Sequence, residues 1–282
     1  MLKKINGSTR LVGILGHPVA HTASPAMHNA AFERLGLNWR YAAFDVAPER
    51  LREAVRGLCA AGLAGLNVTV PHKAAVLPLL DEVDAEARRL GAVNTIVFRN
   101  GKARGSNTDV PGLLEALREA FHFHPRGRTV AIAGCGGAGR AAALGIALAG
   151  ASALILLNRT RSRAREVASA IARLRLKKKP RIVFRAEPCD LLLQATSLGL
   201  DPRDPSPLSE DTLEALAPRR VLEMIYRPAE TALMRLARRK GAHVANGSGM
   251  LLHQGARAFE IWTGRRAPIE AMRRALMKEI RS

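Results

Sequence analysis

Apolar runs alternate with amphipathic stretches over the first third of the chain. Three of these runs have the length of a strand, and we predict strands at Leu11–Leu15, Trp39–Val46 and Gly65–Val70. The periodicity of Pro48–Ala61 predicts a helix, and another helix is expected to begin at Pro25, with Ser24 as its N-cap. Strands that alternate with helices in this way predict an α/β domain.

The pattern then changes to that of a hairpin. Thr95–Arg99 and Lys102–Ser106 are strand-like runs on either side of Asn100-Gly101, a dipeptide that favours a tight turn between antiparallel strands. Val110–Phe121 follows with helical spacing. We expect this helix to connect the first domain to a second one.

A glycine-rich turn joins a strand to a helix within residues 129–160. Val130–Ala133 predicts the strand, small residues at helical spacing follow, and Leu154–Leu157 predicts a second strand. In a dinucleotide-binding loop of the pattern G-x-G-x-x-G, the first glycine makes the turn, the second admits the pyrophosphate, and the third packs the helix on the strand. The alternative is a tight turn without a ligand. The predicted cofactor contacts are the loop and first helical turn, Gly134, Gly136, Gly137, Ala138 and Gly139.

The end of the second of these strands indicates which dinucleotide binds. About twenty residues past such a loop, an NAD-binding chain usually has Asp or Glu for the ribose 2′-hydroxyl. Here Asn158 takes that position, and Arg159, Thr160 and Arg163 follow. Two guanidinium groups and a hydroxyl suit a 2′-phosphate, so the sequence favours NADP. The alternative is that these arginines belong only to a generally basic surface.

The composition limits the class of protein. A chain of 282 residues is long enough for two domains, and 48% hydrophobic residues with 4% aromatic ones indicate cores of Leu, Ala and Val. The cysteines Cys59, Cys135 and Cys189 are isolated, so neither a disulfide framework nor a metal site is indicated. The sequence has no signal peptide and no membrane-spanning run, and we expect a cytoplasmic protein.

The net charge of +20 is concentrated in part of the chain. Residues 159–185 contain eleven Lys and Arg against one acid, Glu166, and residues 173–181 are the densest run. A nucleic-acid-binding surface is one interpretation. A solvated helix end beside a phosphate-binding site is the better one, because few aromatic residues are available to stack on bases. We therefore expect a small-molecule substrate, no nucleic acid or membrane partner, and a monomer or homodimer.

Polar side chains occur where the first predicted strands end. Thr22 and Ser24 place hydroxyl groups beside a helix N-terminus, a favourable position for a carboxylate, although capping alone would also explain Ser24. In the segment NVTVPHK, Asn67 and Thr69 alternate with valines, so both polar side chains face one side of the strand.

A lysine follows directly. Pro71 ends the strand and places Lys73 in the first turn of the next helix, where the positive dipole end favours the neutral amine. A neutral amine suits a group that takes up a proton, although a lone lysine here could also be a surface residue. Asn94 precedes the hairpin and Asp109 follows it. Together these side chains predict a polyol-binding site next to a hydride acceptor.

The chain resembles the shikimate dehydrogenase family over almost its full length. Five blocks carry the resemblance: GHPVAHTASPAMHNAAF, NVTVPHK, GAVNT with NTD, GCGGAGR with NRT, and NGSGMLLHQGARAFEIWTG. The resemblance implies an α/β fold with two domains, a substrate domain (1–109 plus 246–282) and a Rossmann-type NADP-binding domain (110–245). Helices at about 250–260 and 268–280 would return to the first domain, and Val221–Tyr226 would be a late strand of the second.

The resemblance also implies an activity, the NADP-dependent interconversion of 3-dehydroshikimate and shikimate on the route to chorismate and the aromatic amino acids. By matching positions, Lys73 and Asp109 would be the catalytic pair, while Met224 and Gly247 would contact the cofactor. The implied substrate contacts are Thr22 and Ser24 for the carboxylate, Thr69, Asn94, Asp109 and Gln254 for the ring hydroxyls, and Tyr226 and Asn67 around the pocket.

Three positions depart from the usual pattern of this family. Its Ser-x-Ser is Thr22-Ala23-Ser24 here, its Asn-Ala-Thr-Ser begins with Gln194, and an expected Asp is Glu223. The methyl group of Thr22 could reshape the carboxylate seat, so a dehydrogenase with relaxed or shifted preference for quinate is an alternative. A protein of another class, an NADP-binding sensor or a nucleic-acid-binding protein, is the second alternative.

Overall fold

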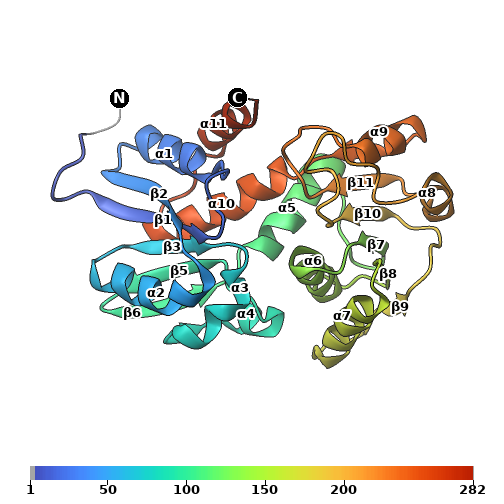
Figure 1. Ribbon diagram of the computed structural model, residues 1–282, viewed down its shortest axis with the longest axis horizontal. Helices are drawn as coiled ribbons and strands as arrows, with labels where there is room; N and C mark the ends of the chain where they lie inside the picture. Colours follow the sequence, from blue (N-terminus) through green and yellow to red (C-terminus); the bar gives the residue numbers. More distant parts are fainter. Residues whose placement is uncertain (1–3, 282) are drawn as a thin grey trace. The chain divides into compact units, whose positions relative to one another are not determined.

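The chain forms two α/β units, and each is built around one six-stranded sheet (Figure 1). The structure is a computed structural model that describes residues 4–281. Unit 1 comprises the described residues up to Gly112 together with those from Leu251 onward, and unit 2 comprises Leu113–Met250. Both boundaries fall inside helices, α5 (Asp109–Phe121) and α10 (Ser248–Thr263), a few residues after the boundaries expected from the sequence.

The sheet of unit 1 is mixed. Its strands are β1 (Arg10–Gly16), β2 (Trp39–Asp45), β3 (Gly65–Val68), β4 (Glu82–Val83), β5 (Thr95–Arg99) and β6 (Lys102–Ser106), in the order β2-β1-β3-β5-β6-β4. β1 pairs in parallel with β2 and β3, whereas β5 pairs antiparallel with β3 and β6. Asn100 and Gly101 both have positive φ, 53° and 70°, so the predicted hairpin turn is confirmed.

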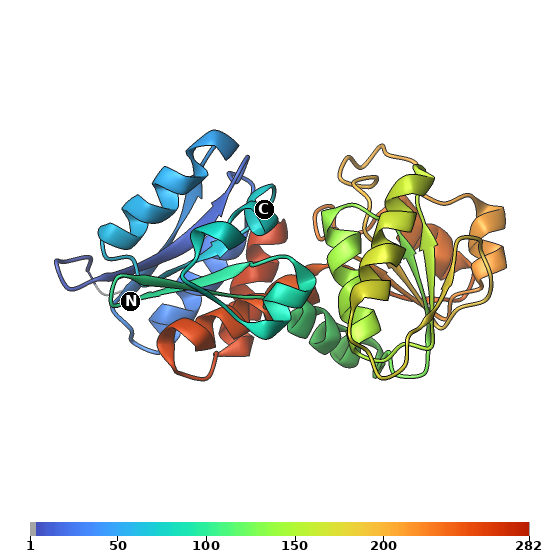
Figure 2. The same cartoon turned by 90° about the horizontal axis from the view of Figure 1, so that it is seen from below.

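Helices cover both faces of this sheet (Figure 2). They are α1 (Ser24–Arg34), α2 (Leu51–Ala60), α3 (His72–Ala75), α4 (Ala85–Leu90), α10 and α11 (Ile269–Arg281), with short 3₁₀ turns at Pro48–Arg50 and Leu77–Leu79. Leu51 and Val55 of α2 belong to one apolar core with Leu66. α11 packs against α1, and the rings of Phe32 and Phe259 join α1 to α10 at 5.3 Å. The C-terminal helices therefore complete unit 1.

The predicted start of helix α1 and the predicted end of strand β3 are wrong. Ser24 is the first residue of α1, and Ala23 occupies the N-cap position without a side-chain cap. The oxygen of Thr22 instead accepts a hydrogen bond from the amide of Ser24, at 3.3 Å, so the threonine does part of the capping. β3 ends at Val68, before the predicted Val70, whose side chain is 66% exposed and whose carbonyl accepts from the amide of His17.

The sheet of unit 2 is parallel throughout. Its strands are β7 (Thr129–Ala133), β8 (Ala153–Leu157), β9 (Arg181–Val183), β10 (Leu191–Gln194), β11 (Arg220–Glu223) and β12 (His243–Ala245), in the order β12-β11-β10-β7-β8-β9. This is the order of a Rossmann-type fold, in which the direction of winding reverses between β7 and β10. The glycine-rich loop follows β7 and therefore lies at the position where such folds bind dinucleotides.

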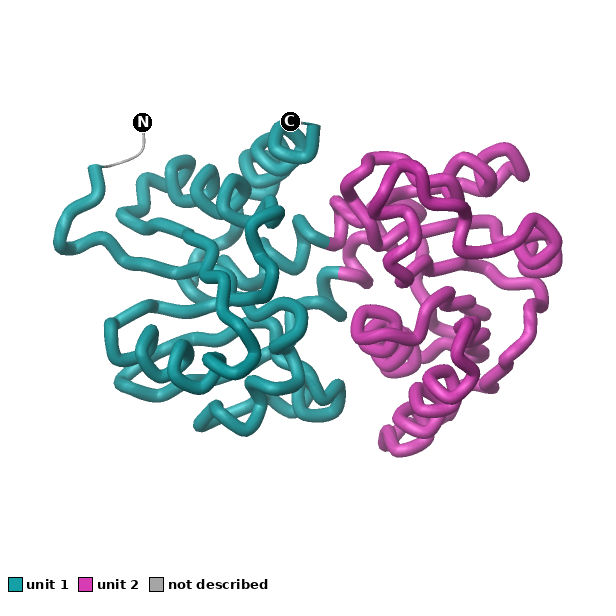
Figure 3. Tube along the Cα trace, viewed as in Figure 1, with its two compact units in different colours: residues 1–112, 251–282 teal, residues 113–250 magenta. Residues whose placement is uncertain are grey.

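Helices flank the second sheet as well (Figures 2 and 3). They are α6 (Gly137–Leu148), α7 (Arg161–Arg173), α8 (Glu210–Leu216) and α9 (Ala232–Arg239). α8 and α9 contribute leucines to a core that also contains Ala131 and Ala133 of β7. β11 ends at Glu223 rather than at the predicted Tyr226, because the carboxylate of Glu223 accepts a hydrogen bond from the amide of Ile225 at 3.1 Å. Among the described residues, no helix has the length and apolar character needed to cross a membrane.

Candidate functional site

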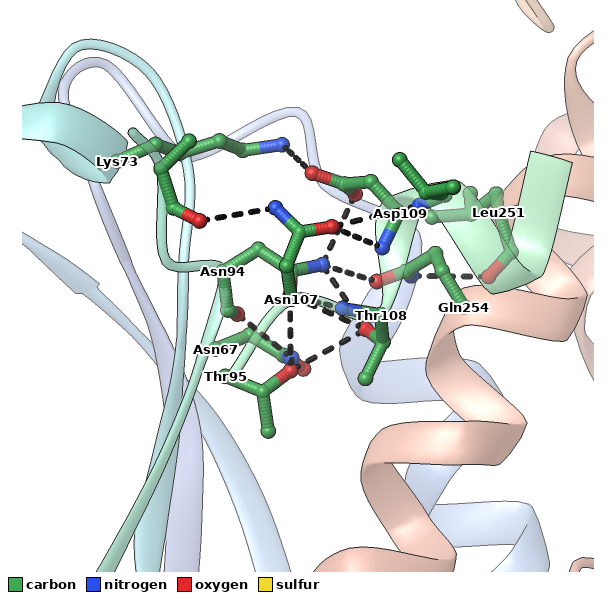
Figure 4. Close-up of polar contacts among 11 residues, drawn as sticks. Asn67, Lys73, Asn94, Thr95, Asn107, Thr108, Asp109, Leu251 and Gln254 are labelled. Carbon is green, nitrogen blue, oxygen red and sulfur yellow. Dashed lines mark hydrogen bonds and ion pairs between the residues drawn. The ribbon is translucent and has the colours of Figure 1, made fainter. Parts of the chain in front are cut away.

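Lys73 and Asp109 form an ion pair in unit 1 (Figure 4). The Lys73 Nζ donates to Asp109 Oδ2 at 2.8 Å. Asp109 is the first residue of α5, and its position is fixed by Asn107, whose Oδ1 accepts from the amides of Asp109 and Val110 at 3.0 and 3.3 Å. The side chain of Asp109 is 10% exposed and that of Lys73 is 32% exposed. The carboxylate is thus held by the protein while the amine remains accessible.

The helix that carries Lys73 is very short. α3 has four residues, little more than one turn, so its macrodipole is small. A full carboxylate charge at 2.8 Å from the amine exceeds it as an electrostatic influence. The carboxylate of Asp109, and not the helix dipole, is therefore the main electrostatic influence on this lysine and the group that orients it.

Asn94 links Asp109 of this pair to two further residues, Thr108 and Gln254 (Figure 4). Its Nδ2 donates to Asp109 Oδ1 at 2.9 Å, to Thr108 Oγ1 at 2.9 Å and to Gln254 Oε1 at 3.4 Å. Its Oδ1 accepts from the amide of Thr108 at 2.7 Å. Gln254 comes from α10, and its Nε2 donates to the carbonyl of Leu251. The structure therefore brings together four residues that were predicted from separate motifs.

Asn67 supports the same cluster from β3. Its Nδ2 donates to the carbonyl of Asn94 at 3.1 Å and to Thr95 Oγ1 at 3.2 Å, and its side chain is buried. The predicted Thr69 lies just past the end of β3 and is half-buried, with its amide bonded to the carbonyl of Leu15. Asn67 is thus a structural support, whereas Thr69 has a side chain that can still meet a ligand.

The two hydroxyl groups predicted for the carboxylate lie side by side. Thr22 Oγ1 donates to Ser24 Oγ at 3.2 Å. Ser24 is buried, with 2% of its surface exposed, and Thr22 is half-buried. Thr22 is therefore the more accessible hydroxyl of the pair.

Several members of this polar cluster were not predicted from the sequence. Thr95 and Thr108 are buried, and their hydroxyls are 3.2 Å apart. Tyr41 is also buried and donates to Asn67 Oδ1 at 2.8 Å. A signal existed for Tyr41, since a tyrosine in a strand of an aromatic-poor chain needs a partner for its hydroxyl. The two threonines were visible as members of the motifs GAVNT and NTD.

The glycine-rich loop of unit 2 is shaped by its backbone. Gly134 has φ of +98°, a conformation that L side chains rarely adopt. A Cβ at Gly139 would overlap the carbonyl of Gly134, so the third glycine is required for helix α6 to approach β7. A Cβ at Gly136 would meet no described atom within 4 Å, so the space beside the second glycine is open. This cradle fits a pyrophosphate at the N-terminus of α6.

Asn158 braces the same loop from the end of β8. Its Oδ1 accepts from the amide of Cys135 at 2.9 Å, and its Nδ2 donates to the carbonyl of Thr160 at 2.9 Å. Arg159, Thr160 and Arg163 are exposed, and Thr160 is the N-cap residue of α7. Asn158 thus sets the shape of the loop, while the arginines present two charges beside it.

Two further predicted cofactor residues meet in unit 2. A Cβ at Gly247 would overlap the carbonyl of Met224, so the glycine permits this close approach. Met224 follows the buried Glu223, whose Oε2 accepts from Thr231 Oγ1 at 3.0 Å and whose pKa is raised by burial. Glu223 is the direct register partner of Gln194, so two of the departures from the family pattern lie on neighbouring strands.

The remaining predicted substrate residue, Tyr226, also belongs to unit 2. It is half-buried and lies three residues beyond Glu223 at the end of β11. Residues 4–281 contain no group of three or more His, Cys, Asp or Glu side chains that could hold a metal ion.

Known proteins resemble this chain over nearly its whole length. The shikimate dehydrogenase (NADP(+)) of Methanopyrus kandleri is 45% identical over 291 residues, which cover 98% of this chain and 98% of that protein. The chain belongs to the shikimate dehydrogenase family. A shikimate dehydrogenase solved in complex with NADP⁺ matches the structure with a TM-score of 0.90 and 39% identity, over 98% of both chains.

Other members of the shikimate dehydrogenase family give the same picture. The shikimate 5-dehydrogenase of Thermus thermophilus, solved in complex with NADP(H) and shikimate, matches with a TM-score of 0.86 and 39% identity, over 96% of this chain and 99% of that one. The family model for the shikimate dehydrogenase substrate binding domain matches residues 14–96, and that for the shikimate 5′-dehydrogenase C-terminal domain matches residues 247–277. The first match contains Lys73 and Asn94, and the second contains Gln254.

Proposed function

We propose that this protein catalyses the NADP-dependent, reversible reduction of 3-dehydroshikimate to shikimate, on the route to chorismate. The observation that carries the proposal is the cluster in which Asp109, itself held by the amide of Asn94, pairs with the amine of Lys73, in a chain of the shikimate dehydrogenase family. A binding protein has no need for an accessible amine paired with a carboxylate that is itself fixed by amide donors. An alcohol dehydrogenase needs that arrangement to move a proton.

The chemical step divides between this chain and its cofactor. NADP⁺, when bound, supplies the nicotinamide carbon that accepts a hydride from the alcohol carbon of shikimate. Lys73 takes the proton of the same hydroxyl, and in the reverse direction its ammonium returns that proton to the oxygen. Asp109, at 2.8 Å from the Lys73 Nζ, orients the amine and balances its charge when it is protonated.

The substrate would be oriented by polar groups of several elements. Thr22 and Ser24 bind its carboxylate through their paired hydroxyls, with Thr22 the more exposed. Four side chains of unit 1 bind the ring hydroxyls, Thr69, Asn94, Asp109 and Gln254, and Asn67 supports them. Tyr226 of unit 2 is a further proposed substrate contact. Asn94 is suited to this role because its amide is already directed by Asp109 and Gln254.

Unit 2 would hold NADP. Gly134, Gly136 and Gly139, with Gly137 and Ala138, receive the pyrophosphate at the start of α6. Asn158 keeps the loop in shape, and Arg159, Thr160 and Arg163 bind the 2′-phosphate. Met224 and Gly247 lie against one another and contact the nicotinamide half of the cofactor.

The proposal is tested by the absorbance of reduced nicotinamide. Purified protein is mixed with shikimate or quinate, each with NADP⁺ and with NAD⁺. Rapid reduction with shikimate and NADP⁺, and much slower reduction with NAD⁺, is the expected result. No turnover with any of the four pairs would overturn the proposed function.

A second candidate within the same chemistry is a preference for quinate. The observation in its favour is Thr22, which carries a methyl group at the more accessible position of the hydroxyl pair. Faster turnover of quinate than of shikimate in the same assay would favour it. Thr22→Ser would then shift the preference back toward shikimate, whereas Ser24, being buried, offers no such test.

We assign no role in catalysis to the basic segment, residues 173–181. We expect residues 173–181 to be a solvated surface and the protein to act as a monomer or homodimer without nucleic acid. A gel shift with single-stranded RNA that persists at physiological salt would contradict this part of the proposal.

A further inference from the structure

Tyr41 has a buried hydroxyl outside the set of residues predicted for the site. It lies on β2, its residue surface is 4% exposed, and its hydroxyl donates to Asn67 Oδ1 at 2.8 Å. Burial raises the pKa of the Tyr41 phenol well above its ordinary value, and a hydrogen bond with Ser24 offsets part of that shift. The phenol therefore stays protonated at neutral pH and can donate its proton to Asn67.

The hydroxyl of Tyr41 is linked to the polar cluster through Asn67. The Asn67 Nδ2 donates to the backbone carbonyl of Asn94 at 3.1 Å, and the side-chain amide of Asn94 donates to Asp109 Oδ1 at 2.9 Å (Figure 4). Tyr41 is therefore connected, through Asn67 and Asn94, to the carboxylate that orients the catalytic amine.

The ring of Tyr41 is held in place by His28. The two rings stack with centroids 4.4 Å apart and planes 4° apart. His28 is fully buried, and neither of its ring nitrogens has a hydrogen-bond partner in the described part of the chain. Burial lowers the pKa of His28 to about 3, so the imidazole is neutral at physiological pH.

Neighbours on α10 prevent this stack from moving. Trp262 lies 5.4 Å from His28, measured between ring centroids. A Cβ at Gly255 would lie 3.3 Å from His28 Nε2 and would overlap the end of Met27, so the helix approaches the imidazole as closely as a glycine allows. The ring of Tyr41 is therefore closely packed, with its hydroxyl directed at Asn67.

We propose that Tyr41 is a positioning residue for the reaction at Lys73, because its hydroxyl fixes Asn67 and, through Asn94, the carboxylate of Asp109. The inference rests on the proposed function, since it requires that the amine of Lys73 takes part in the reaction. Without the hydroxyl, Asn67 loses a buried partner, and the side chains that orient Asp109 and the Lys73 amine are less well fixed.

The test is Tyr41→Phe in the full chain, which keeps the stacked ring and removes only the hydroxyl. We expect kcat for shikimate oxidation to fall about 10-fold, with the KM for NADP⁺ changed by less than about 2-fold, because small misalignments of reacting groups slow the chemical step. The deuterium isotope effect on kcat, with shikimate labelled at the carbon that loses the hydride, should increase as hydride transfer becomes rate-limiting.

Trp39→Phe is the matched control. Trp39 lies on the same strand, is buried, and packs against Phe32 rather than within the polar cluster. It should lower the melting temperature and leave the isotope effect as in the wild type. The isotope effect reports only folded, active molecules, so it remains informative even if Tyr41→Phe folds poorly.

The outcomes separate the two claims. If the wild type oxidises shikimate and Tyr41→Phe has the wild-type kcat, or a lower kcat with an unchanged isotope effect, the positioning role of Tyr41 is wrong and the proposed function stands. If the wild type does not oxidise shikimate, the proposed function fails first. A double variant with Asn67→Ala should be less impaired than the product of the single effects, since both act through one series of hydrogen bonds.

Discussion

The polar cluster of unit 1 and the glycine loop of unit 2 are built in opposite ways. In unit 1, buried side chains hold one another, as Asn94 holds Asp109 and Asn67 holds Thr95. In unit 2 the loop is defined by backbone conformation and by missing side chains at Gly134 and Gly139. The first site depends on which atoms donate and which accept, and the second depends on volume. Substitutions that one site tolerates should therefore disable the other.

The largest effect is expected from the amine of unit 1. Lys73→Ala removes the proton acceptor, so kcat should fall about 10³-fold, within the range of general acid–base catalysis, while the affinity for NADP⁺ changes little. Lys102→Ala, an exposed lysine on β6, is the control and should behave as the wild type. Steady-state kinetics and fluorescence titration with NADPH measure both quantities. Near-normal turnover of Lys73→Ala would remove this lysine from the mechanism.

The converse change adds one carbon to the loop of unit 2. In Gly139→Ala the new methyl group overlaps the Gly134 carbonyl, so the loop has to shift, and we expect NADP⁺ to bind about 100-fold more weakly. In Gly136→Ala the new methyl group has no described atom within 4 Å, so the melting temperature should be unchanged. The methyl group occupies the space proposed for the pyrophosphate, so NADP⁺ should still bind more weakly. Equal melting temperatures for both variants would contradict the clash at Gly139.

The two units should also respond oppositely to acid. The pKa of His28 in unit 1 is lowered from 6.5 to about 3. Below pH 6.5 the unfolded chain therefore binds a proton that the folded chain does not, and the free energy of unfolding decreases as the pH is lowered. The loss is about 1.4 kcal/mol per pH unit, or about 2 kcal/mol between neutrality and about pH 5. Glu223 in unit 2 has a raised pKa, so its contribution is full at low pH and is lost as pH rises.

His28→Phe is the test of this contrast. It keeps a ring against Tyr41 and removes the group that titrates, so the variant should lose about 2 kcal/mol less than the wild type on the same acidification. Both tryptophans of the chain, Trp39 and Trp262, belong to unit 1, so their fluorescence in urea titrations reports the unfolding of that unit. Parallel pH profiles for the two proteins would show that His28 is not the source of the acid sensitivity.

The smallest effect concerns cofactor choice in unit 2. Arg159→Ala with Arg163→Ala should reduce the preference for NADP⁺ over NAD⁺ about 10-fold, because exposed charge-assisted contacts are weakened by solvent. Arg165→Ala, another exposed arginine of α7, should leave the ratio of kcat/KM values unchanged. If the double variant keeps the wild-type ratio, the 2′-phosphate is bound elsewhere.

Local patterns predicted the elements whose geometry is itself local. The hairpin turn at Asn100-Gly101 and the glycine loop follow from the conformations available to those residues. The strand end at Glu223 could not be predicted, because it depends on a buried carboxylate turning back onto the amide of Ile225. The N-cap of α1 was predicted at Ser24, one residue late; in the structure Ser24 begins the helix, and its own amide donates to the hydroxyl of Thr22.

The polar cluster was predicted by motif and not by contact. Lys73, Asn94, Asp109 and Gln254 could be named from the sequence, and the structure brings them together. The bond from Tyr41 to Asn67 spans 26 positions of the chain and joins two strands, so no periodicity reveals it. Hydrogen bonds between distant segments are specified by the sheet register, which a single sequence does not display.

Because unit 1 consists of two segments on either side of unit 2, its last segment is synthesised after unit 2. Trp262 of α10 donates to the carbonyl of Ile96 at 2.9 Å, and Gly65 is a glycine because a Cβ there would overlap this indole. Residues 113–250 leave the ribosome before this indole does, so unit 2 has all of its strands while the first sheet still lacks one of its covering layers. A nascent chain can therefore acquire its dinucleotide fold before its substrate site is complete.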